Sequence, residues 1–347
     1  MTLQQLEYIV AIENYGYFVE AAEACGVTQS TMSLMVKKLE EELDVRIFNR
    51  DTHPVTVTEI GRKVINEARE VVYHSKQLVE LTRSEKELSS GDLNIAMTTT
   101  VAPVLMAGMF KFMRLRYPAL RLRTEEMITT TILAKLKKAE IDMGILVSPV
   151  NDPDLLEIPL YKEKFFAYVS PENAMARQES LERERVLDNP IWIMRDGVRL
   201  FDKSMLRPGE AFTYEKMYEG GRVGILLQIA NESGGITIIP ETHIKFLPTS
   251  MQKCLKPIVN PVPKRTICLV IRNDYIHEQI MNIVIRSIKS IIPYELWDSM
   301  IMSEYLRLYN ARSHFSNLLQ PFLVNLIEGG QALTVDVKHA DDFFTFI

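Results

Sequence analysis

The chain is poor in cysteine and has no long apolar run. Its 347 residues include only Cys25, Cys254 and Cys268, too few for a disulfide scaffold. No apolar stretch approaches the about 20 residues that a membrane-spanning helix needs. The N-terminal segment MTLQQLEYIV has no basic region ahead of an apolar one, so we expect no secretory signal. These absences predict a cytoplasmic protein with no membrane partner.

Motifs typical of enzymes are also missing. The sequence has no phosphate-binding loop, no zinc-ligand spacing among its six histidines and no Gly-x-Ser-x-Gly elbow. We therefore expect no enzymatic activity, no cofactor and no metal. A solute-binding protein would need export, which the missing signal disfavours.

Positive charge is not in excess. The 40 lysines and arginines are outnumbered by 45 acidic residues, so the net charge of -5 does not by itself favour nucleic-acid binding. The basic residues are clustered locally, and the acids Glu40, Glu41 and Glu42 could face away from DNA. Charge therefore neither favours nor disfavours DNA binding. The length predicts two or three domains, and 47% hydrophobic with 24% charged residues is typical of folded protein.

The first 45 residues predict a helix-turn-helix. Gly26 supplies a turn, and Thr28 stands where the N-cap of the next helix belongs. In that helix, an apolar stripe is predicted to be buried, and it consists of Met32, Val36, Leu39 and Leu43. Two helices joined by a short turn, the second with a small and polar N-terminal face, are typical of DNA binding.

A β-hairpin wing is predicted next. Val45 and Ile47, then Val55 and Val57, alternate around a turn-rich tip at 49–54. Arg50 and His53 at this tip could reach phosphate or the minor groove. The alternative is a helical cap of an enzyme, whose polar residues are merely solvated.

Several motifs in this region resemble the DNA-binding domain of LysR-type transcriptional regulators. The matching segments are Ala21-Ala22-Glu23, Val27-Thr28-Gln29-Ser30-Thr31-Met32-Ser33, Lys38-Leu39-Glu40, Phe48-Asn49-Arg50 and Thr56-Val57-Thr58-Glu59-Ile60-Gly61. A weaker resemblance covers most of the chain to about residue 295. It implies a bacterial regulator that binds a double-stranded DNA operator.

The resemblance also implies which residues contact DNA. Base-edge contacts are implied for Gln29, Ser30 and Ser33, because the family's recognition helix enters the major groove. Phosphate contacts are implied for Thr28, Thr31, Lys37 and Arg50, which would position the helix without reading sequence. Leu34 stands where members of the family commonly have a longer polar side chain. Direct readout of a base at this position is therefore reduced, or shifted to contact with a thymine methyl.

A long helix is predicted after the wing. From Thr58 to about Glu87 there is no proline and, after Gly61, no glycine. Apolar residues recur at close to seven-residue spacing, which favours antiparallel pairing with a second copy; a core helix of a larger domain is the alternative. This segment looks like the family's linker helix, so we expect a dimer or tetramer.

The remaining chain predicts an α/β domain of two lobes. Short strands and helices alternate from Asp92 onward, which indicates a parallel sheet. Our predicted organisation is a winged helix-turn-helix at 1–58, a linker helix at 59–88, an effector-binding domain at 92–300 and an extension of unknown role at 301–347. Lobe 1 would comprise about 92–161 with 267–300, and lobe 2 about 162–266. This looks like the family's effector domain, similar in architecture to periplasmic binding proteins.

Threonines and a serine at strand ends predict an effector site. Hydroxyls and free N–H groups at the carboxyl ends of parallel strands can bind an anion or small ligand. The candidates are Thr99, Thr100, Thr129, Thr130 and Ser148. Each threonine could instead act only as an N-cap.

Three segments resemble the peroxide-sensing OxyR branch of the family: Glu23-Ala24-Cys25-Gly26-Val27, Thr100-Val101-Ala102-Pro103 and Met194-Arg195-Asp196-Gly197-Val198-Arg199-Leu200. That branch needs a reactive cysteine in the last segment, where this chain has Val198 and Arg199. No thiol switch is therefore expected there, and Arg199 suggests an anionic small-molecule effector. Solvated surface arginine is the alternative for Arg199, and a redox role of Cys254 with Cys268 is the alternative for the signal. RNA polymerase is a further expected partner.

Overall fold

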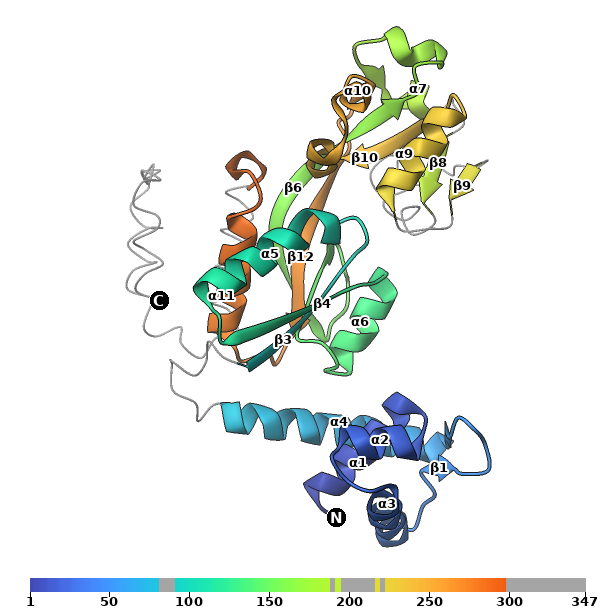
Figure 1. The fold of residues 1–347 in the computed structure, drawn as a ribbon, viewed down its shortest axis with the longest axis vertical. Helices are drawn as coiled ribbons and strands as arrows, with labels where there is room; N and C mark the ends of the chain where they lie inside the picture. Colours follow the sequence, from blue (N-terminus) through green and yellow to red (C-terminus); the bar gives the residue numbers. More distant parts are fainter. Residues whose placement is uncertain (81–90, 188–190, 195–215, 219–221, 298–347) are drawn as a thin grey trace. The chain divides into compact units, whose positions relative to one another are not determined.

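The computed structural model describes residues 1–80, 91–187, 191–194, 216–218 and 222–297 (Figure 1). Arg199, positions 81–88 of the expected linker helix and the extension 301–347 lie outside these residues. None of the described helices is long and apolar enough to cross a membrane.

The N-terminal region has the expected helix-turn-helix and wing. Its elements are α1 (Leu3–Tyr15), α2 (Phe18–Ala24), α3 (Gln29–Leu43), β1 (Phe48–Asn49), β2 (Thr56–Val57) and α4 (Glu59–Glu80). Thr2 and Gln5 form a capping box at the start of α1, and Gly16, with φ 74°, ends that helix. Gly26 makes the turn before α3 with φ 68°, a conformation that suits glycine.

Two details differ from the sequence expectation. Leu43 is 36% exposed, because α3 ends there and the stripe of Met32, Val36 and Leu39 has already filled the core. The paired wing residues are Phe48 with Val57, rather than strands built on Val45 and Ile47. The Glu40 carboxylate accepts hydrogen bonds from the backbone N–H groups of Ile47 and Phe48, which ties this stretch to α3 before the hairpin begins.

The long helix α4 does not use its apolar residues as one stripe. Ile65, Ala68 and Val72 are buried in the same core as α1 and α3. Val71 and Leu78 lie outside that core and are 48% and 67% exposed. One face of α4 thus completes the DNA-binding domain, and another remains on the surface of the single chain.

The first lobe is built on a parallel core. Its elements are β3 (Gly91–Met97), α5 (Ala102–Arg116), β4 (Leu120–Glu126), α6 (Thr129–Lys137), β5 (Met143–Val147), β12 (Lys264–Arg272), α11 (Glu278–Lys289) and the short helix η4 (Tyr294–Leu296). Strand β3 pairs in parallel with β4 and β5. Figure 1 shows α5 and α11 on one side of these strands and α6 on the other.

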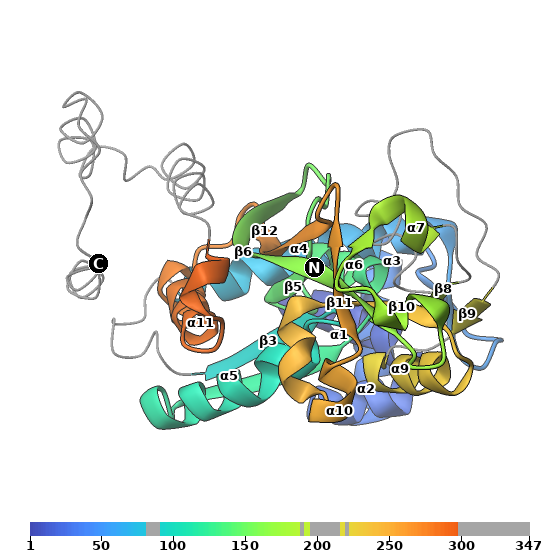
Figure 2. The ribbon, with the colours of Figure 1, turned by 90° about the horizontal axis from the view of Figure 1, so that it is seen from above.

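The second lobe continues the same sheet. Its elements are β7 (Leu181–Glu182), α7 (Arg183–Leu187), β8 (Ile191–Met194), β9 (Lys216–Tyr218), α9 (Val223–Glu232), β10 (Ile236–Pro240), α10 (Thr249–Gln252), β11 (Leu255–Val259) and the short helices η1 (Ala174–Arg177) and η3 (Glu241–Phe246). With β6 (Leu155–Val169), the strand order β4-β3-β5-β12-β6-β10-β8-β9 runs through both lobes (Figures 1 and 2).

Strand β6 (Leu155–Val169) joins the lobes. Its residues up to Lys164 pair with β12, and from Phe165 onward they pair with β10. The chain therefore leaves the first lobe on β6 and returns on β12. Side chains at this crossover contact both lobes. A site at the crossover could therefore couple the two lobes.

Candidate DNA interface and effector site

The start of α3 presents a polar, exposed surface. Thr28 is the N-cap, as expected, and its hydroxyl accepts a hydrogen bond from the backbone N–H of Thr31. Gln29 and Ser30 follow directly and are exposed. Because capping orders this first turn, these side chains project from a rigid helix end. Both are accessible to a partner on the outer face of α3.

Arg50 in the wing is anchored to α3. Its guanidinium donates to Glu40 Oε2 at 2.8 Å and to Ser33 Oγ at 3.2 Å, and it lies over the ring of Phe18. Glu40, one of the acids that could face away from DNA, pairs with this wing arginine. It connects the wing to the recognition helix. The hydrogen bond to Ser33 also places Arg50 directly beside the recognition helix.

The remaining predicted DNA contacts lie on the surface. Lys37 is exposed and pairs with Glu41 at 3.5 Å, one turn along α3. Thr31 is exposed in the first turn, and His53 is exposed between β1 and β2. An exposed ion pair of this kind contributes little to stability, so Lys37 can exchange its partner for a phosphate.

Three parallel strands bring the predicted effector residues to one edge of the first lobe. Met97 pairs with Glu126 of β4 and with Ile145 of β5, so these three strands end at the same level. Thr98 and Thr99 follow β3, Thr129 follows β4 and Ser148 follows β5. Thr99, Thr129 and Ser148 are half-buried, and Thr130 is exposed.

Two helices start at this edge without a side-chain cap. The N-cap of α5 is Val101 and that of α6 is Ile128, neither of which donates or accepts a capping hydrogen bond through its side chain. The threonines at 129 and 130 are therefore in the first turn rather than N-caps. Uncapped helix N-termini carry partial positive charge and favour an anion.

Thr98 is the residue at this edge that sequence reasoning did not select. It is 8% exposed, and its hydroxyl has no hydrogen-bond partner. Leaving a buried hydroxyl unsatisfied costs about 1–3 kcal/mol. A ligand that bonded to it would recover that cost. The signal in the sequence was its position as the first hydroxyl after an apolar strand.

A buried polar network lies at the crossover between the lobes. Arg265 of β12 donates to Glu163 of β6 at 2.7 Å and to the Thr100 hydroxyl at 2.8 Å. The same Glu163 accepts from the backbone N–H of Thr242 at 3.1 Å, and His243 Nε2 lies 2.8 Å from the Thr100 carbonyl oxygen. Thr100, a predicted effector residue, is thus held by the second lobe and by both crossover strands.

Sequence reasoning missed this network, although the strands carry a signal for it. Arg265 shares a strand face with Ile267 and Leu269, which are fully buried. A charged residue in register with a buried apolar face needs a buried partner. Burial also lowers the pKa of His243, so its imidazole is neutral near pH 7 and donates its Nε2 proton to Thr100.

The two cysteines of the second half lie far apart. Along β6, the carbonyl of Cys254 bonds to Val169, whereas Cys268 pairs with Pro159. Ten residues of extended strand span about 30 Å, and a disulfide needs Cα atoms within about 7 Å. Cys268 is also fully buried, which raises its pKa well above the usual value. An intramolecular Cys254–Cys268 switch does not fit this arrangement.

Comparison with family models decides the relationship. The model described as "LysR substrate binding domain" matches residues 86–289, and the model of the "Bacterial regulatory helix-turn-helix protein, lysR family" matches residues 3–62. The chain belongs to the LysR family. It is a LysR-type transcriptional regulator with a DNA-binding helix-turn-helix and an effector-binding domain.

The curated relatives of this LysR-type chain include OxyR-type regulators. It is 29% identical to the hydrogen peroxide-inducible genes activator of Pectobacterium carotovorum, over 78% of this chain and 90% of that protein. It is 28% identical to the DNA-binding transcriptional dual regulator OxyR of Escherichia coli, with the same coverage. These relatives are transcription regulators rather than enzymes.

Solved structures agree with this relationship. A full-length OxyR variant from Pseudomonas aeruginosa matches with a TM-score of 0.75 and 25% identity, over 86% of this chain and 98% of that one. OxyR from Porphyromonas gingivalis matches with a TM-score of 0.54 and 27% identity, over 60% of this chain and 96% of that one. The family architecture of DNA-binding domain and two-lobed α/β domain is thus shared.

Proposed function

We propose that this LysR-type regulator responds to a small anionic effector bound at the edge of the first lobe, where β3, β4 and β5 end. The carrying observation is the Thr98 hydroxyl, which is buried without a partner beside the uncapped N-termini of α5 and α6. A carboxylate or phosphate oxygen could accept hydrogen bonds from the Thr98 hydroxyl and from the first turn of α6. At α5 the N–H groups of Val101 and Ala102 already donate to the Thr98 carbonyl and Pro103 has none, so α5 would contribute only its helix dipole.

The other contributors are Thr99, Thr129, Thr130 and Ser148, on the same edge. Thr100 contributes indirectly, because its hydroxyl already accepts a hydrogen bond from Arg265. Arg199, outside the described residues, is the proposed cationic partner of the anion. A ligand at this edge would act on the crossover network through Thr100, and thereby bias the relative position of the lobes.

We also propose that Gln29, Ser30 and Ser33 read the DNA bases. Phosphate contacts are assigned to Thr28, Thr31, Lys37, Arg50 and His53. Exposure of the first turn of α3 supports the first assignment. The anchored position of Arg50 next to Ser33 supports the second. We infer that the protein acts in the cytoplasm as a dimer or tetramer, contacts RNA polymerase and has no catalytic activity.

Thermal shift measurements against a panel of small carboxylates and phosphates test the effector site. A ligand of the folded protein should raise the melting temperature increasingly with its concentration. Thr98→Val keeps the side-chain shape and removes only the unpartnered hydroxyl, so the free protein should remain stable while the ligand-dependent shift shrinks. Arg199→Ala should abolish the shift and leave basal DNA binding intact.

Thr124→Val is the matched control, since Thr124 lies inside β4, opposite Ile95 rather than at the level of Thr98. It should keep the full shift. An unchanged ligand response in Thr98→Val would remove this hydroxyl from the site. An unchanged response in Arg199→Ala would remove the arginine.

A further inference from the structure

Helix α4 has a third face, which is polar and lies against the first lobe. Arg69, Tyr73 and Gln77 follow one another at four-residue spacing, which places them on one side of the helix. Arg69 is 6% exposed and Gln77 is 9% exposed, although both side chains are polar. Gln77 donates to the backbone carbonyl of Asp274, directly after β12, at 2.9 Å. This face is separate from the buried apolar residues of α4, which pack in the helix-turn-helix core.

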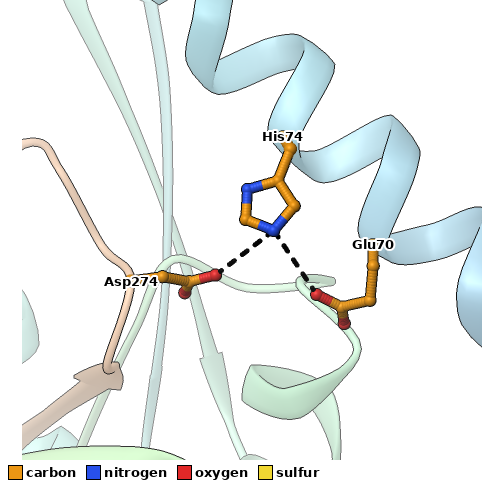
Figure 3. Close-up of side chains that lie close together, drawn as sticks. All are labelled: Glu70, His74 and Asp274. Atoms are coloured by element: carbon orange, nitrogen blue, oxygen red, sulfur yellow. Dashed lines mark ion pairs between the residues drawn. The ribbon is translucent and has the colours of Figure 1, made fainter.

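Arg272, the last residue of β12, lies at the centre of this contact. Its guanidinium donates to Glu70 Oε1 at 3.0 Å and Oε2 at 2.6 Å, and to Asp274 Oδ1 at 2.9 Å and Oδ2 at 3.0 Å. Its Cζ atom lies 4.4 Å from the centre of the Tyr73 ring. Figure 3 shows the two carboxylates beside His74, one on α4 and the other on the segment after β12. The guanidinium therefore joins the helix of the DNA-binding domain to the effector domain.

Arg69 makes a second connection between the two domains. Its guanidinium pairs with Glu13 Oε2 at 2.5 Å and donates to Asn14 Oδ1 at 2.7 Å, both on α1. It also lies 3.6 Å from Glu140 Oε1 of the first lobe. Its Nε is buried and has no hydrogen-bond partner among the described residues. Burying charged groups costs free energy that their pairing offsets only in part, so this contact can open and close.

Helix α6 links this contact to the opposite edge of the first lobe. The helix has nine residues, from Thr129 at the edge where β3, β4 and β5 end to Lys137. Arg272 donates to the backbone carbonyl of Lys137 at 2.7 Å, so the guanidinium that pairs with Glu70 also caps the C-terminus of α6. A helix of this length spans about 13 Å. A shift of α6 along its axis therefore acts directly on Arg272.

We propose that the contact made by Arg272 and Arg69 is a latch through which the first lobe holds the DNA-binding domain. Occupation of the N-terminus of α6 shifts the latch between closed and open populations, because an anion and Arg272 interact with opposite ends of one helix dipole. Strand β12 also carries Arg265 of the crossover network, so movement of the lobes reaches the latch as well. The effector part of this inference rests on the proposed function, whereas the latch itself does not.

Hydrogen exchange of the full-length protein tests the latch without any effector. Arg272→Gln removes the cation and keeps a polar side chain at the end of β12. The backbone amides of residues 73–80, which follow the last core residue of α4, should exchange about tenfold faster than in the wild type. Amides of α3 should keep their rates. Glu70→Gln should have a similar effect alone and none when added to Arg272→Gln, because both substitutions break the same link.

Operator affinity tests the effector part. The probe is a duplex that the wild-type protein selects from a random DNA library, with the carboxylate or phosphate that gives the largest thermal shift. This compound should change the operator affinity of the wild type about tenfold, which is typical of coupling between two sites. Arg272→Gln should keep the thermal shift and lose the change in affinity. A panel without any thermal shift would refute the proposed effector, and hydrogen exchange would still decide the latch.

Arg121→Gln is the matched control, because Arg121 forms an exposed ion pair with Asp92 at 2.8 Å in the same lobe. It should match the wild type in both measurements. Wild-type exchange of residues 73–80 in both Arg272→Gln and Glu70→Gln would overturn the latch. Faster exchange in α3 as well would assign these residues to general stability and would also overturn it. An operator response retained in Arg272→Gln would overturn the link to the effector.

Discussion

At the residue scale, the feature that changes the interpretation of the DNA interface is the Glu40–Arg50 pair. Glu40 accepts from Arg50 and from the backbone of Ile47 and Phe48, so one carboxylate positions both the wing and its arginine. The guanidinium keeps donors for a phosphate, since its hydrogen bonds to Glu40 and Ser33 use two of its five N–H groups. The pair fixes the position of the wing arginine relative to α3.

We therefore predict different effects for Gln29→Ala and Arg50→Ala. Gln29→Ala should cost about 1–3 kcal/mol at one operator position, because a bidentate base contact is lost. Arg50→Ala should weaken binding to all sequences and flatten the salt dependence by about one unit. Electrophoretic mobility shifts on an operator mutation series, repeated at several salt concentrations, measure both. Altered base preference in Arg50→Ala without any in Gln29→Ala would contradict the assignment.

His243 predicts a pH dependence of stability. Burial lowers its pKa below the ordinary value of 6.5, so the unfolded chain binds the proton more readily than the folded one. The free energy of unfolding should therefore fall as the pH is lowered through the ordinary value toward the folded-state pKa. Denaturant titrations at about pH 7.5 and pH 5.5 should show a smaller decrease for His243→Gln than for the wild type. Equal decreases in the two proteins would show that His243 is not the group responsible.

At the element scale, α4 has one face buried in the helix-turn-helix core and another exposed on the surface. Its buried residues Ile65, Ala68 and Val72 belong to the helix-turn-helix core, whereas Val71 and Leu78 are exposed seven residues apart. Seven-residue spacing is the repeat with which paired helices keep an apolar seam in contact. The helix therefore has the surface that a second copy needs without sacrificing the DNA-binding core.

The double substitution Val71→Glu with Leu78→Glu should split the oligomer. Like charges would be buried across the paired helices, while the separate core face of α4 is untouched. Sedimentation velocity at micromolar concentration should show the wild type as at least a dimer and the variant as a smaller species. Glu67→Gln on the same helix serves as the control. A monomeric wild type would end the dimer prediction.

At the scale of the whole molecule, the crossover strands β6 and β12 determine which residues lie close enough to take part in sensing. They place Cys254 and Cys268 in different lobes, and they place Glu163, Arg265 and Thr100 together. Cys268 is buried with a raised pKa, and the pKa of Cys25 is raised as well, chiefly by burial. Cys25 and Cys268 are then mostly protonated at neutral pH, and the thiolate is the reactive form.

We predict that hydrogen peroxide leaves operator binding unchanged, although the curated relatives include peroxide-inducible gene activators. Operator affinity should be measured before and after peroxide treatment in the wild type and in a variant with all three cysteines replaced by serine. The two proteins should behave alike. A peroxide response that disappears only in the cysteine-free variant would restore the redox interpretation.

Local patterns predicted much of the fold. The Thr28 cap, the helix from Gln29 to Leu43 and the alternation of strands and helices after Asp92 follow from capping and periodicity. The wing pairing was misplaced because the Glu40 side chain, seven residues before Ile47, accepts from the backbone N–H of Ile47. Alternation of apolar residues does not reveal this side-chain contact.

The sequence by itself determined the family, the helix-turn-helix and the alternation of strands and helices, since these depend on short-range spacing. Tertiary structure alone decided which side chains meet. Thr98 became a candidate because strand packing buried its hydroxyl, and Glu163 met Arg265 because β6 and β12 pair across about a hundred residues. Glu70, His74 and Asp274 came together only when α4 contacted the end of β12. The physical reason is that burial and long-range pairing depend on the whole chain, whereas periodicity is set by neighbouring residues.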